Sequence, residues 1–409
     1  MEKKLFLKGL ICGVLLTAFL IGGAYFAKRL IFNRDPDGIV EGQEEQTPNT
    51  FEEKALKQIE LLRSSIQNSF LYEVDDDEML AEISRGVMKS LGDPYSVYYT
   101  ADEYDEMMNQ SNGTYYGIGV SVSPENEKDY TGCKVVRAFK GSPAEEAGIQ
   151  SGDIFLKIAG TDVTDMNLSD AAALIRGQLD SYVDLVLLRD GKELEFRIQR
   201  RKIEVDTVAG RMVTDDIGYI YIAEFDSITS TQFDRTFDEL RSQGMQKLIV
   251  DLRENPGGLV KTAVDMCDKF LPEGMVLYSK DKQGRINEYR SKTGRDETLP
   301  MVVLVNGNSA SASEIYAGAM QARGRAKVIG TTTYGKGIIQ GVFNLPGQKD
   351  GIKITISSYF TPADVCIHGV GIKPDIEVEL SEDYKNKKDP TDEDDNQLQA
   401  AIQELMKTP

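Results

Sequence analysis

The stretch "MVVLVNGNSASASEIYAGAMQARGRAKVIG", residues 301–330, predicts a buried strand, a polar turn, an amphipathic helix and a second strand. Three serines alternate with alanines where the helix begins. Ser311 and Glu314 match the Ser-x-x-Glu capping box, so one interpretation is that these serines only start the helix. The other interpretation is that one of them is a nucleophile, and the rest of the chain has to decide between the two.

The same order of strand and helix extends on both sides of this stretch. The segments "IGYIYIAEF" (217–225) and "KLIVDLRENPGG" (247–258) predict strands, with an amphipathic helix between them. Further strands are predicted in "AKVIGTTTYGKGIIQGVFNL" (326–345) and "GIKITISSYFTPAD" (351–364). Repeated β-then-α units predict a core sheet with helices packed over it.

A separate small domain is predicted ahead of this core. Residues 113–203 alternate short β-branched runs with Gly-rich turns and two short helices, which predicts a compact, partly open barrel. Three markers in this segment resemble a PDZ domain of the bacterial protease type. They are "YYGIGV" (115–120), "GSPAEEAGIQSGD" (141–153) and "VDLVLLRDGKELEFRI" (183–198).

The PDZ resemblance implies a peptide-binding site at the Gly-x-Gly turn. Such a turn leaves backbone N–H groups free for a peptide's terminal carboxylate, while the peptide adds as an extra strand. The residues expected there are Gly117, Ile118, Gly119 and Val120. Arg176, at the end of the second helix, has two interpretations: it couples the bound peptide to the core, or it is an ordinary arginine favoured by the helix dipole.

The composition limits the classes of partner and cofactor. The chain has 409 residues and a net charge of -19, which argues against nucleic acid, because phosphates are met by clustered Lys and Arg. None of the four cysteines has C-x-x-C or other metal-ligand spacing, so we predict neither a metal nor a cofactor. Cys133, Cys267 and Cys366 are expected to be buried small hydrophobic residues, and a single disulfide among them stays open.

The N-terminal segment differs from the rest. It carries no charged residue from Gly9 to Ala27, after a lysine-rich start. A helix of this length spans roughly 28 Å, close to one bilayer core. We therefore predict an uncleaved anchor, with a cleaved signal peptide as the alternative. The expected localisation is the cell membrane, single-pass, with the catalytic part extracytoplasmic.

A serine nucleophile needs a general base, and the chain has only one histidine that could serve as one, His368. It lies among glycines in a predicted turn, which makes it a poor base for a Ser-His-Asp arrangement. A lysine can replace it where burial lowers the pKa of the ammonium. Lys336 is the best candidate, because Gly335 and Gly337 allow close backbone approach and apolar residues follow. The alternative is a surface lysine in a Gly-rich turn.

Four motifs in order resemble the carboxy-terminal processing proteases, also called tail-specific proteases, of peptidase family S41. They are "DLRENPGGL", "NSASASEIYAGAMQARGRAKVIG", "TYGKGIIQ" and "GVGIKPDIEV". The resemblance covers most of residues 51–380 and implies a multidomain α/β fold, with a crotonase-like ββα protease core and an inserted PDZ domain. In that family the middle serine attacks, a lysine twenty-five positions later is the base, and a glutamine four positions further orients it. The resemblance thus implies a catalytic set of Ser311, Lys336 and Gln340, with the flanking serines as caps.

The groups around this set follow from the same motifs. The N–H of Ala312, at the helix start, is expected to bind the oxyanion together with an N–H of Gly257 or Gly258. If residues 336 and 340 lie on one strand, their side chains point to the same face. The Gln340 amide carbonyl would then accept a hydrogen bond from Lys336 and hold it toward Ser311. Glu254 departs from the family pattern, where Asn or Asp is more usual, and it changes the charge near the oxyanion region.

Six segments are predicted. They are an anchor (1–30), a linker (31–50), a helical region (51–110), the PDZ domain (111–203), the protease core (204–380), and a solvated acidic linker with a last helix (381–409). The predicted function is a serine endopeptidase that recognises the free C-terminus of protein or peptide substrates and cleaves near it. A catalytically silent PDZ scaffold and a coenzyme A acyl-transfer enzyme are the alternatives. The helical region and the last helix are candidate contacts of a homodimer.

Overall fold

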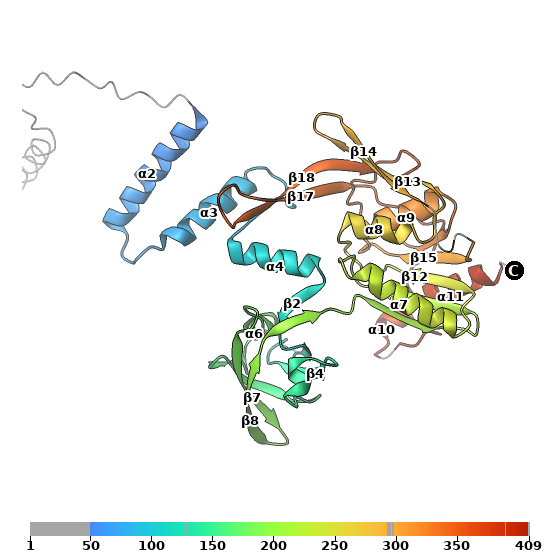
Figure 1. Cartoon of the computed structure of the whole chain (residues 1–409), viewed down its shortest axis with the longest axis horizontal. Coiled ribbons are helices and arrows are strands. Elements are labelled where there is room, and N and C mark those ends of the chain that lie inside the picture. Colours follow the sequence, from blue (N-terminus) through green and yellow to red (C-terminus); the bar gives the residue numbers. More distant parts are fainter. Residues whose placement is uncertain (1–49, 127–128, 293–295, 297, 389, 408–409) are drawn as a thin grey trace, which may run out of the picture. The chain divides into compact units, whose positions relative to one another are not determined.

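The computed structural model describes residues 50–126, 129–292, 296, 298–388 and 390–407 (Figure 1). The chain divides into two compact units, Met1–Asp75 and Asp76–Pro409. The described part of the first unit, residues 50–75, contains helix α2, Phe51–Ser69, which begins at a capping box. In that box the backbone N–H of Glu53 donates to Thr50 Oγ1 at 3.2 Å, and the Glu53 carboxylate accepts from the Thr50 N–H at 3.3 Å.

The second unit is built around a six-stranded sheet in the order β10-β11-β12-β15-β16-β19. Its strands are β10 Val208–Met212, β11 Ile217–Ile222, β12 Lys247–Asp251, β15 Met301–Val305, β16 Lys327–Gly330 and β19 Ile376–Glu377. All neighbours from β11 to β19 are parallel, and β10 alone is antiparallel. The predicted β-then-α core is therefore confirmed.

Helices cover both faces of this sheet (Figure 1). They are α7 Thr229–Ser242, α8 Val260–Cys267 and α9 Ala312–Ala322 on one face, and α11 Asn396–Met406 on the other. Along β15, Val303 and Val305 pack with α7 to α9, whereas Val302 and Leu304 pack with α11. Burial on both faces explains why this strand is apolar throughout, as parallel strands usually are.

The acidic segment before α11 is not simply a solvated linker, contrary to the prediction. Asp395 is only 4% exposed and its carboxylate accepts from the backbone N–H groups of Gln397 and Leu398 at the start of the helix. Arg253, just after β12, donates to both carboxylate oxygens of Asp395 at 3.1 and 2.8 Å. The pattern of exposed charges upstream gave no sign of this buried partner.

A second sheet has the order β1-β18-β13-β14, with β17 also paired to β18. Its strands are β1 Val97–Tyr99, β13 Gly274–Asp281, β14 Ile286–Ser291, β17 Ile338–Asn344 and β18 Gly351–Phe360. Helices α3 Asp76–Lys89 and α4 Ala101–Ser111 flank β1. The prediction that residues 51–109 are helical is confirmed for α2, α3 and α4. It missed strand β1, which pairs with β18 at the edge of the sheet.

The barrel-like segment contains a sheet in the order β3-β4-β5-β7-β8, with β6 on β5, and the ribbon β2-β9. The strands are β2 Thr114–Gly117, β3 Val120–Ser123, β4 Lys134–Ala138, β5 Ile154–Ile158, β6 Thr161–Asp162, β7 Tyr182–Arg189, β8 Lys192–Gln199 and β9 Arg201–Glu204, with helices α5 Pro143–Glu146 and α6 Leu168–Ile175. Strand β3 pairs only with β4, so it lies at the sheet edge. One further short helix, α10 Glu382–Asn386, follows the core.

The cysteines partly match expectation. Cys133 and Cys267 are buried, but Cys366 is exposed, and all three thiols are free. The expectation of burial is therefore wrong for Cys366.

The membrane prediction needs correction. Among the residues that the structure describes, no helix is both long enough and apolar enough to cross a membrane. The predicted localisation, single-pass in the cell membrane, is corrected on that finding. The predicted span from Gly9 to Ala27 itself lies outside the described residues.

Candidate active site

The loops that follow three adjacent parallel strands hold four of the predicted site residues, Gly257, Gly258, Ser311 and Lys336. Strand β12 leads into residues 252–259, β15 into 306–311, and β16 into 331–337. The carboxyl ends of neighbouring parallel strands meet at one edge of a sheet, which is where ligands bind in open α/β folds. Segments far apart in the sequence are therefore brought together by the order of strands.

Ser311 stands at the start of α9 in a strained backbone conformation. Its φ of 55° and ψ of -111° lie outside the regions that L-residues usually occupy. Such outliers persist only where the surroundings hold them, and they concentrate at functional sites. The Tyr359 hydroxyl donates to the Ser311 carbonyl at 3.2 Å and is one of the contacts that hold it. Ser311 is partly exposed, while the next residue, Ala312, is fully buried.

The two neighbouring serines do not cap the helix, and that prediction is wrong. Ser309 Oγ donates to the Leu252 carbonyl at 2.8 Å, and Ser313 Oγ donates to the Asn255 carbonyl at 3.0 Å. Both serines are fully buried. They tie the start of α9 to the loop after β12.

Glu314 joins the segment that carries Ser311 to the segment that carries Lys336. Its carboxylate is 0% exposed and accepts four hydrogen bonds. Oε2 accepts from the backbone N–H groups of Ser311 and Lys336, both at 2.8 Å. Oε1 accepts from the Gly335 N–H at 2.7 Å and from the Thr333 hydroxyl at 2.6 Å. A buried carboxylate with four donors is satisfied, and it fixes both segments to one point.

The glycine turn after β12 lies directly against Ser311. Gly257 has a φ of 110°, and a Cβ added there would lie 2.6 Å from the Ala310 carbonyl oxygen, 2.8 Å from Ser311 Cβ and 2.9 Å from the Ala312 nitrogen. Its N–H donates to Asn255 Oδ1 at 2.8 Å. Its carbonyl accepts from the Phe225 N–H at 2.7 Å. Only glycine fits this approach.

Glu254 is held in place by two amides. It has a φ of 61°, and its carboxylate accepts from Asn306 Nδ2 at 2.6 Å and from Asn308 Nδ2 at 2.7 Å. Asn and Asp adopt this left-handed conformation more readily than Glu. The two hydrogen bonds from the Asn306 and Asn308 side chains hold the Glu254 carboxylate in place. They also link the loops after β12 and β15.

Lys336 is half-buried, and its side chain lies over an aromatic ring. Its ammonium is 4.4 Å from the centroid of the Tyr95 ring, on the loop between α3 and β1. Burial lowers the pKa of Lys336, and the positive charge of Lys353 lowers it further, while the carboxylates of Asp93 and Glu314 act in the opposite direction. A lowered pKa is what a lysine base needs near neutral pH.

Gln340 lies on β17, and the premise from which its orientation was predicted is wrong. Strand β17 begins at Ile338, so Lys336 precedes it, and the pairing with β18 shifts register between Ile339 and Gln340. The even spacing of residues 336 and 340 therefore does not place them on one strand face. In the structure the Gln340 amide Nε2 donates to Thr355 Oγ1 at 3.3 Å.

The single histidine is exposed in a turn that packs against the lysine segment. The Gly369 N–H donates to the Gly335 carbonyl at 2.8 Å, and a Cβ added at Gly337 would lie 2.5 Å from the His368 nitrogen. The turn thus supports the backbone around Lys336. This matches the interpretation of His368 as a loop residue.

The PDZ residues lie at the entry to the edge strand β3. Gly119 has a φ of 77°, and a Cβ there would lie 2.4 Å from Ser142 Cβ. Ile118 is fully buried in the domain core, so its side chain is a packing residue and only its backbone faces the turn. Val120 begins β3, and Gly117 ends β2. Arg176 follows α6 as its C-cap, with its guanidinium 5.4 Å from the Tyr115 ring centroid and 3.5 Å from Glu106 Oε1.

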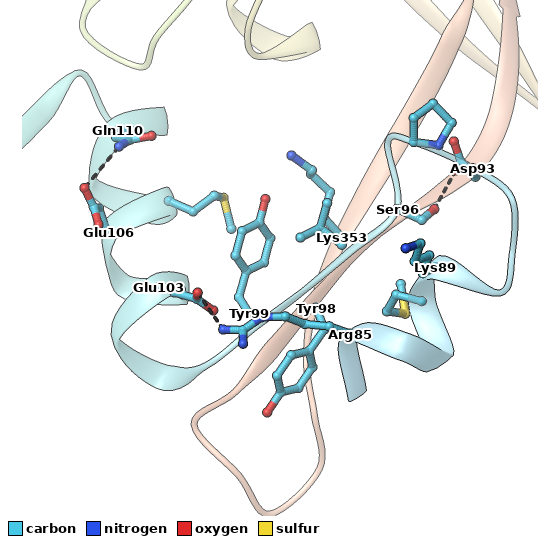
Figure 2. Close-up of a pocket in the computed structure, with 14 residues that line it drawn as sticks. Arg85, Lys89, Asp93, Ser96, Tyr98, Tyr99, Glu103, Glu106, Gln110 and Lys353 are labelled. Carbon is cyan, nitrogen blue, oxygen red and sulfur yellow. Dashed lines mark hydrogen bonds and ion pairs between the residues drawn. The ribbon is translucent and has the colours of Figure 1, made fainter. Parts of the chain in front are cut away.

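A cavity of about 640 Å³ opens between α3, β1, α4 and β18. Figure 2 shows Arg85 reaching Glu103 across its floor, and Asp93 bonded to Ser96 at one end. Lys353 also lines it. This cavity was not predicted from the sequence, because it is formed by side chains from segments about 250 residues apart.

Two residues of the site were missed in the sequence. Glu314 was recognised only as a capping partner, although a charged residue inside an otherwise apolar helix is a signal for a buried polar role. Tyr95 was part of "GDPYS", which indicates a turn and offered no sign that its ring contacts Lys336.

Comparison with known proteins decides the family. The sequence model of peptidase family S41 matches residues 216–378, and that of the PDZ domain matches 135–189. A third, the N-terminal domain of the activating protease CtpB, matches 18–103. The carboxy-terminal-processing protease of Bartonella bacilliformis is 35% identical over 321 residues, which cover 76% of this chain and 72% of that protein. The chain belongs to the carboxy-terminal processing protease family.

Other relatives agree with this assignment. The carboxy-terminal processing protease CtpA of Bacillus subtilis is 35% identical over 319 residues, covering 77% of this chain and 67% of that protein. A putative S41 protease from Bacteroides fragilis shares the fold, with a TM-score of 0.50 and 17% identity, over 80% of this chain and 90% of that chain. This family member is therefore a serine-type peptidase, with an S41 protease core and a PDZ domain.

Proposed function

We propose that this family member cleaves protein substrates with a Ser-Lys dyad, in which Ser311 is the nucleophile and Lys336 the base. The observation that carries the proposal is the shared carboxylate of Glu314, which accepts from the backbone N–H groups of both residues at 2.8 Å. One buried group thus fixes the positions of nucleophile and base. The strained backbone of Ser311 and the lowered pKa of Lys336 support the same roles.

In the proposed reaction, neutral Lys336 takes the proton of the Ser311 hydroxyl as Oγ attacks the peptide carbonyl carbon. The tetrahedral intermediate collapses when the lysinium gives that proton to the leaving amine, and an acyl-enzyme remains. Water then attacks the ester, with Lys336 again as the base, and releases the new C-terminus.

Two backbone N–H groups are proposed to stabilise the oxyanion. Ala312 N–H is the first of helix α9 and has no partner inside the helix. Gly257 N–H is already bonded to Asn255, so we assign the second donor to Gly258. The peptide bond between Gly257 and Gly258 is trans, so its carbonyl and its N–H point in opposite directions. The Gly257 carbonyl points at the Phe225 N–H, and the Gly258 N–H therefore points away from Phe225, which supports its assignment as the second donor. Gly257 contributes by its close backbone approach.

Gln340 is proposed to orient the lysine during turnover. Its amide nitrogen donates to Thr355, which leaves the amide oxygen to accept a hydrogen bond from the Lys336 ammonium. This assignment keeps the role implied by the family motif, although the two residues do not share a strand.

The PDZ domain is proposed to capture the free C-terminus of the substrate. Strand β3 lies at a sheet edge, and the turn Gly117–Val120 enters it, so a peptide can add as a strand with its carboxylate at the turn. Arg176 is proposed to couple the bound peptide to the rest of the chain. Its ion pair with Glu106 supports this role, since a substrate carboxylate would compete for the same guanidinium.

The test is proteolysis of casein by the full chain, followed by gel and mass spectrometry, with an excess of a peptide bearing a free C-terminus. Ser311→Ala and Lys336→Ala are compared with Ser151→Ala and Lys192→Ala, which change exposed residues of the same two types. We expect cleavage by the wild type and both controls, and none by the two site variants. Equal cleavage by all five proteins would overturn the dyad. An inactive wild type that still binds the peptide would instead support the silent scaffold.

A further inference from the structure

The cavity between α3, β1, α4 and β18 is lined by three cationic side chains, Arg85, Lys89 and Lys353, of which Lys89 is exposed. Arg85 pairs with Glu82 at 2.6 Å and with Glu103 at 2.8 Å. Lys353 is half-buried at the cavity wall, and it forms no ion pair with any residue that the structure describes. Its ammonium lies 5.6 Å from the centroid of the Tyr99 ring.

The carboxylates that line the cavity already have partners. Asp93 accepts from Ser96 Oγ at 2.5 Å and from the Tyr95 N–H at 3.0 Å. Glu106 accepts from Gln110 at 3.3 Å and lies 3.5 Å from Arg176. In Figure 2, Lys353 projects beside Tyr99 into the space that α4 faces, with no dashed line to any residue drawn.

The position of Lys353 on β18 places the cavity beside the catalytic segment. Lys353 and Thr355 are two residues apart on one strand, so their side chains lie on the same face about 7 Å apart along it. Thr355 is the partner of Gln340, and Lys353 is close enough to Lys336 to lower the pKa of that ammonium. Lys353 therefore joins the cavity to the surroundings of Lys336.

We propose that this cavity is a subsite for a carboxylate of the peptide substrate, with Lys353 as the group that binds it. The proposal rests on the proposed Ser-Lys protease and adds a substrate preference to it. A half-buried ammonium beside an aromatic wall binds a carboxylate more strongly than an exposed lysine does, because water screens it less. The carboxylate is that of an Asp or Glu side chain near the scissile bond, because the C-terminus itself is proposed to bind at the PDZ turn.

The test uses peptides of one length that carry Glu, Gln or Lys at a single position, moved one residue at a time across the scissile bond. Each is made with a free and with an amidated C-terminus. Affinity is measured by fluorescence anisotropy on the full chain bearing Ser311→Ala, and kcat/KM on the active chain. Lys353→Gln is compared with Lys349→Gln, which removes an exposed lysine from the same hairpin but outside the cavity.

We expect Glu to be preferred over Gln by about tenfold at one position. Lys353→Gln should remove that ratio and leave the affinity for the Gln peptide within about threefold, while Lys349→Gln keeps the ratio. A preference for the free over the amidated terminus is assigned to the PDZ turn and should survive Lys353→Gln. Equal affinity for Glu and Gln peptides at every position, or a Glu preference that survives Lys353→Gln, would overturn the subsite. Because binding is measured on Ser311→Ala, a failure of cleavage counts only against the proposed protease.

Discussion

The Lys336 ammonium lies 4.4 Å from the centre of the Tyr95 ring. A cation held over an aromatic face is stabilised in its charged form, so this contact raises the pKa of the lysine. Burial acts in the opposite direction and is the largest cause of the lowered pKa of Lys336. The two effects together set the pH at which the proposed base loses its proton.

Replacing Tyr95 by Leu should lower that pKa. Leu keeps the apolar burial but loses the ring, whose contact is worth about 0.5–2 kcal/mol, or about 0.4–1.5 pH units. The rise of kcat/KM with pH should then move to lower pH. Tyr95→Phe keeps the ring and is the matched control, so its profile should stay near that of the wild type. A profile that moves to higher pH in the Leu variant would contradict this role.

Glu314→Gln should damage both activity and stability. An amide has one acceptor oxygen and a donor nitrogen, so it cannot accept all four hydrogen bonds that the carboxylate accepts. Each donor left unpaired costs about 1–3 kcal/mol, and a shift of about 1 Å in the site can cost about a hundredfold in rate. Kinetics and thermal unfolding would measure both effects. Glu273→Gln, at an exposed position, should change neither. Wild-type kcat in the Glu314 variant would refute the positioning role.

Gly257→Ala should abolish activity because the new methyl would overlap the backbone around Ser311. Gly347→Ala is the matched control. Gly347 also has a positive φ, of 76°, but no atom lies within 4 Å of an added Cβ. Both variants carry backbone strain of about 1 kcal/mol or more, yet only the first changes the site. Comparable kcat/KM values for the two variants would show that the close approach does not matter.

Asp226→Asn should stabilise the chain above neutral pH. Burial, with a smaller contribution from Glu224, raises the pKa of Asp226 to about 7. The folded state therefore keeps a proton between about pH 4 and pH 7 that the unfolded state has lost, so stability falls as pH rises through this range. Asn does not titrate, so the variant does not undergo this fall in stability as the pH rises. The urea midpoint of the variant should exceed the wild-type midpoint by more at pH 8 than at pH 5. An equal difference at both pH values would contradict the raised pKa.

The sequence predicted the order of strands and helices because these depend on local patterns. The apolar β15 and the capped α9 illustrate this. It could not predict partners that only the folded chain brings together. The Glu314 carboxylate contacts residues about twenty positions away, and Arg253 meets Asp395 across more than a hundred. The functions of Ser309 and Ser313 were missed for the same reason, because a serine that caps and one that bonds a distant carbonyl have the same local sequence.

The central claim is that Ser311 is a nucleophile activated by Lys336. The most direct measurement is labelling of the full chain with a fluorophosphonate, with the modified residue located by mass spectrometry and the rate followed against pH. We predict a single label on Ser311, a rate that rises with pH as Lys336 loses its proton, and no labelling in Lys336→Ala. Labelling at another residue, or labelling of Ser311 at an unchanged rate in Lys336→Ala, would contradict the account.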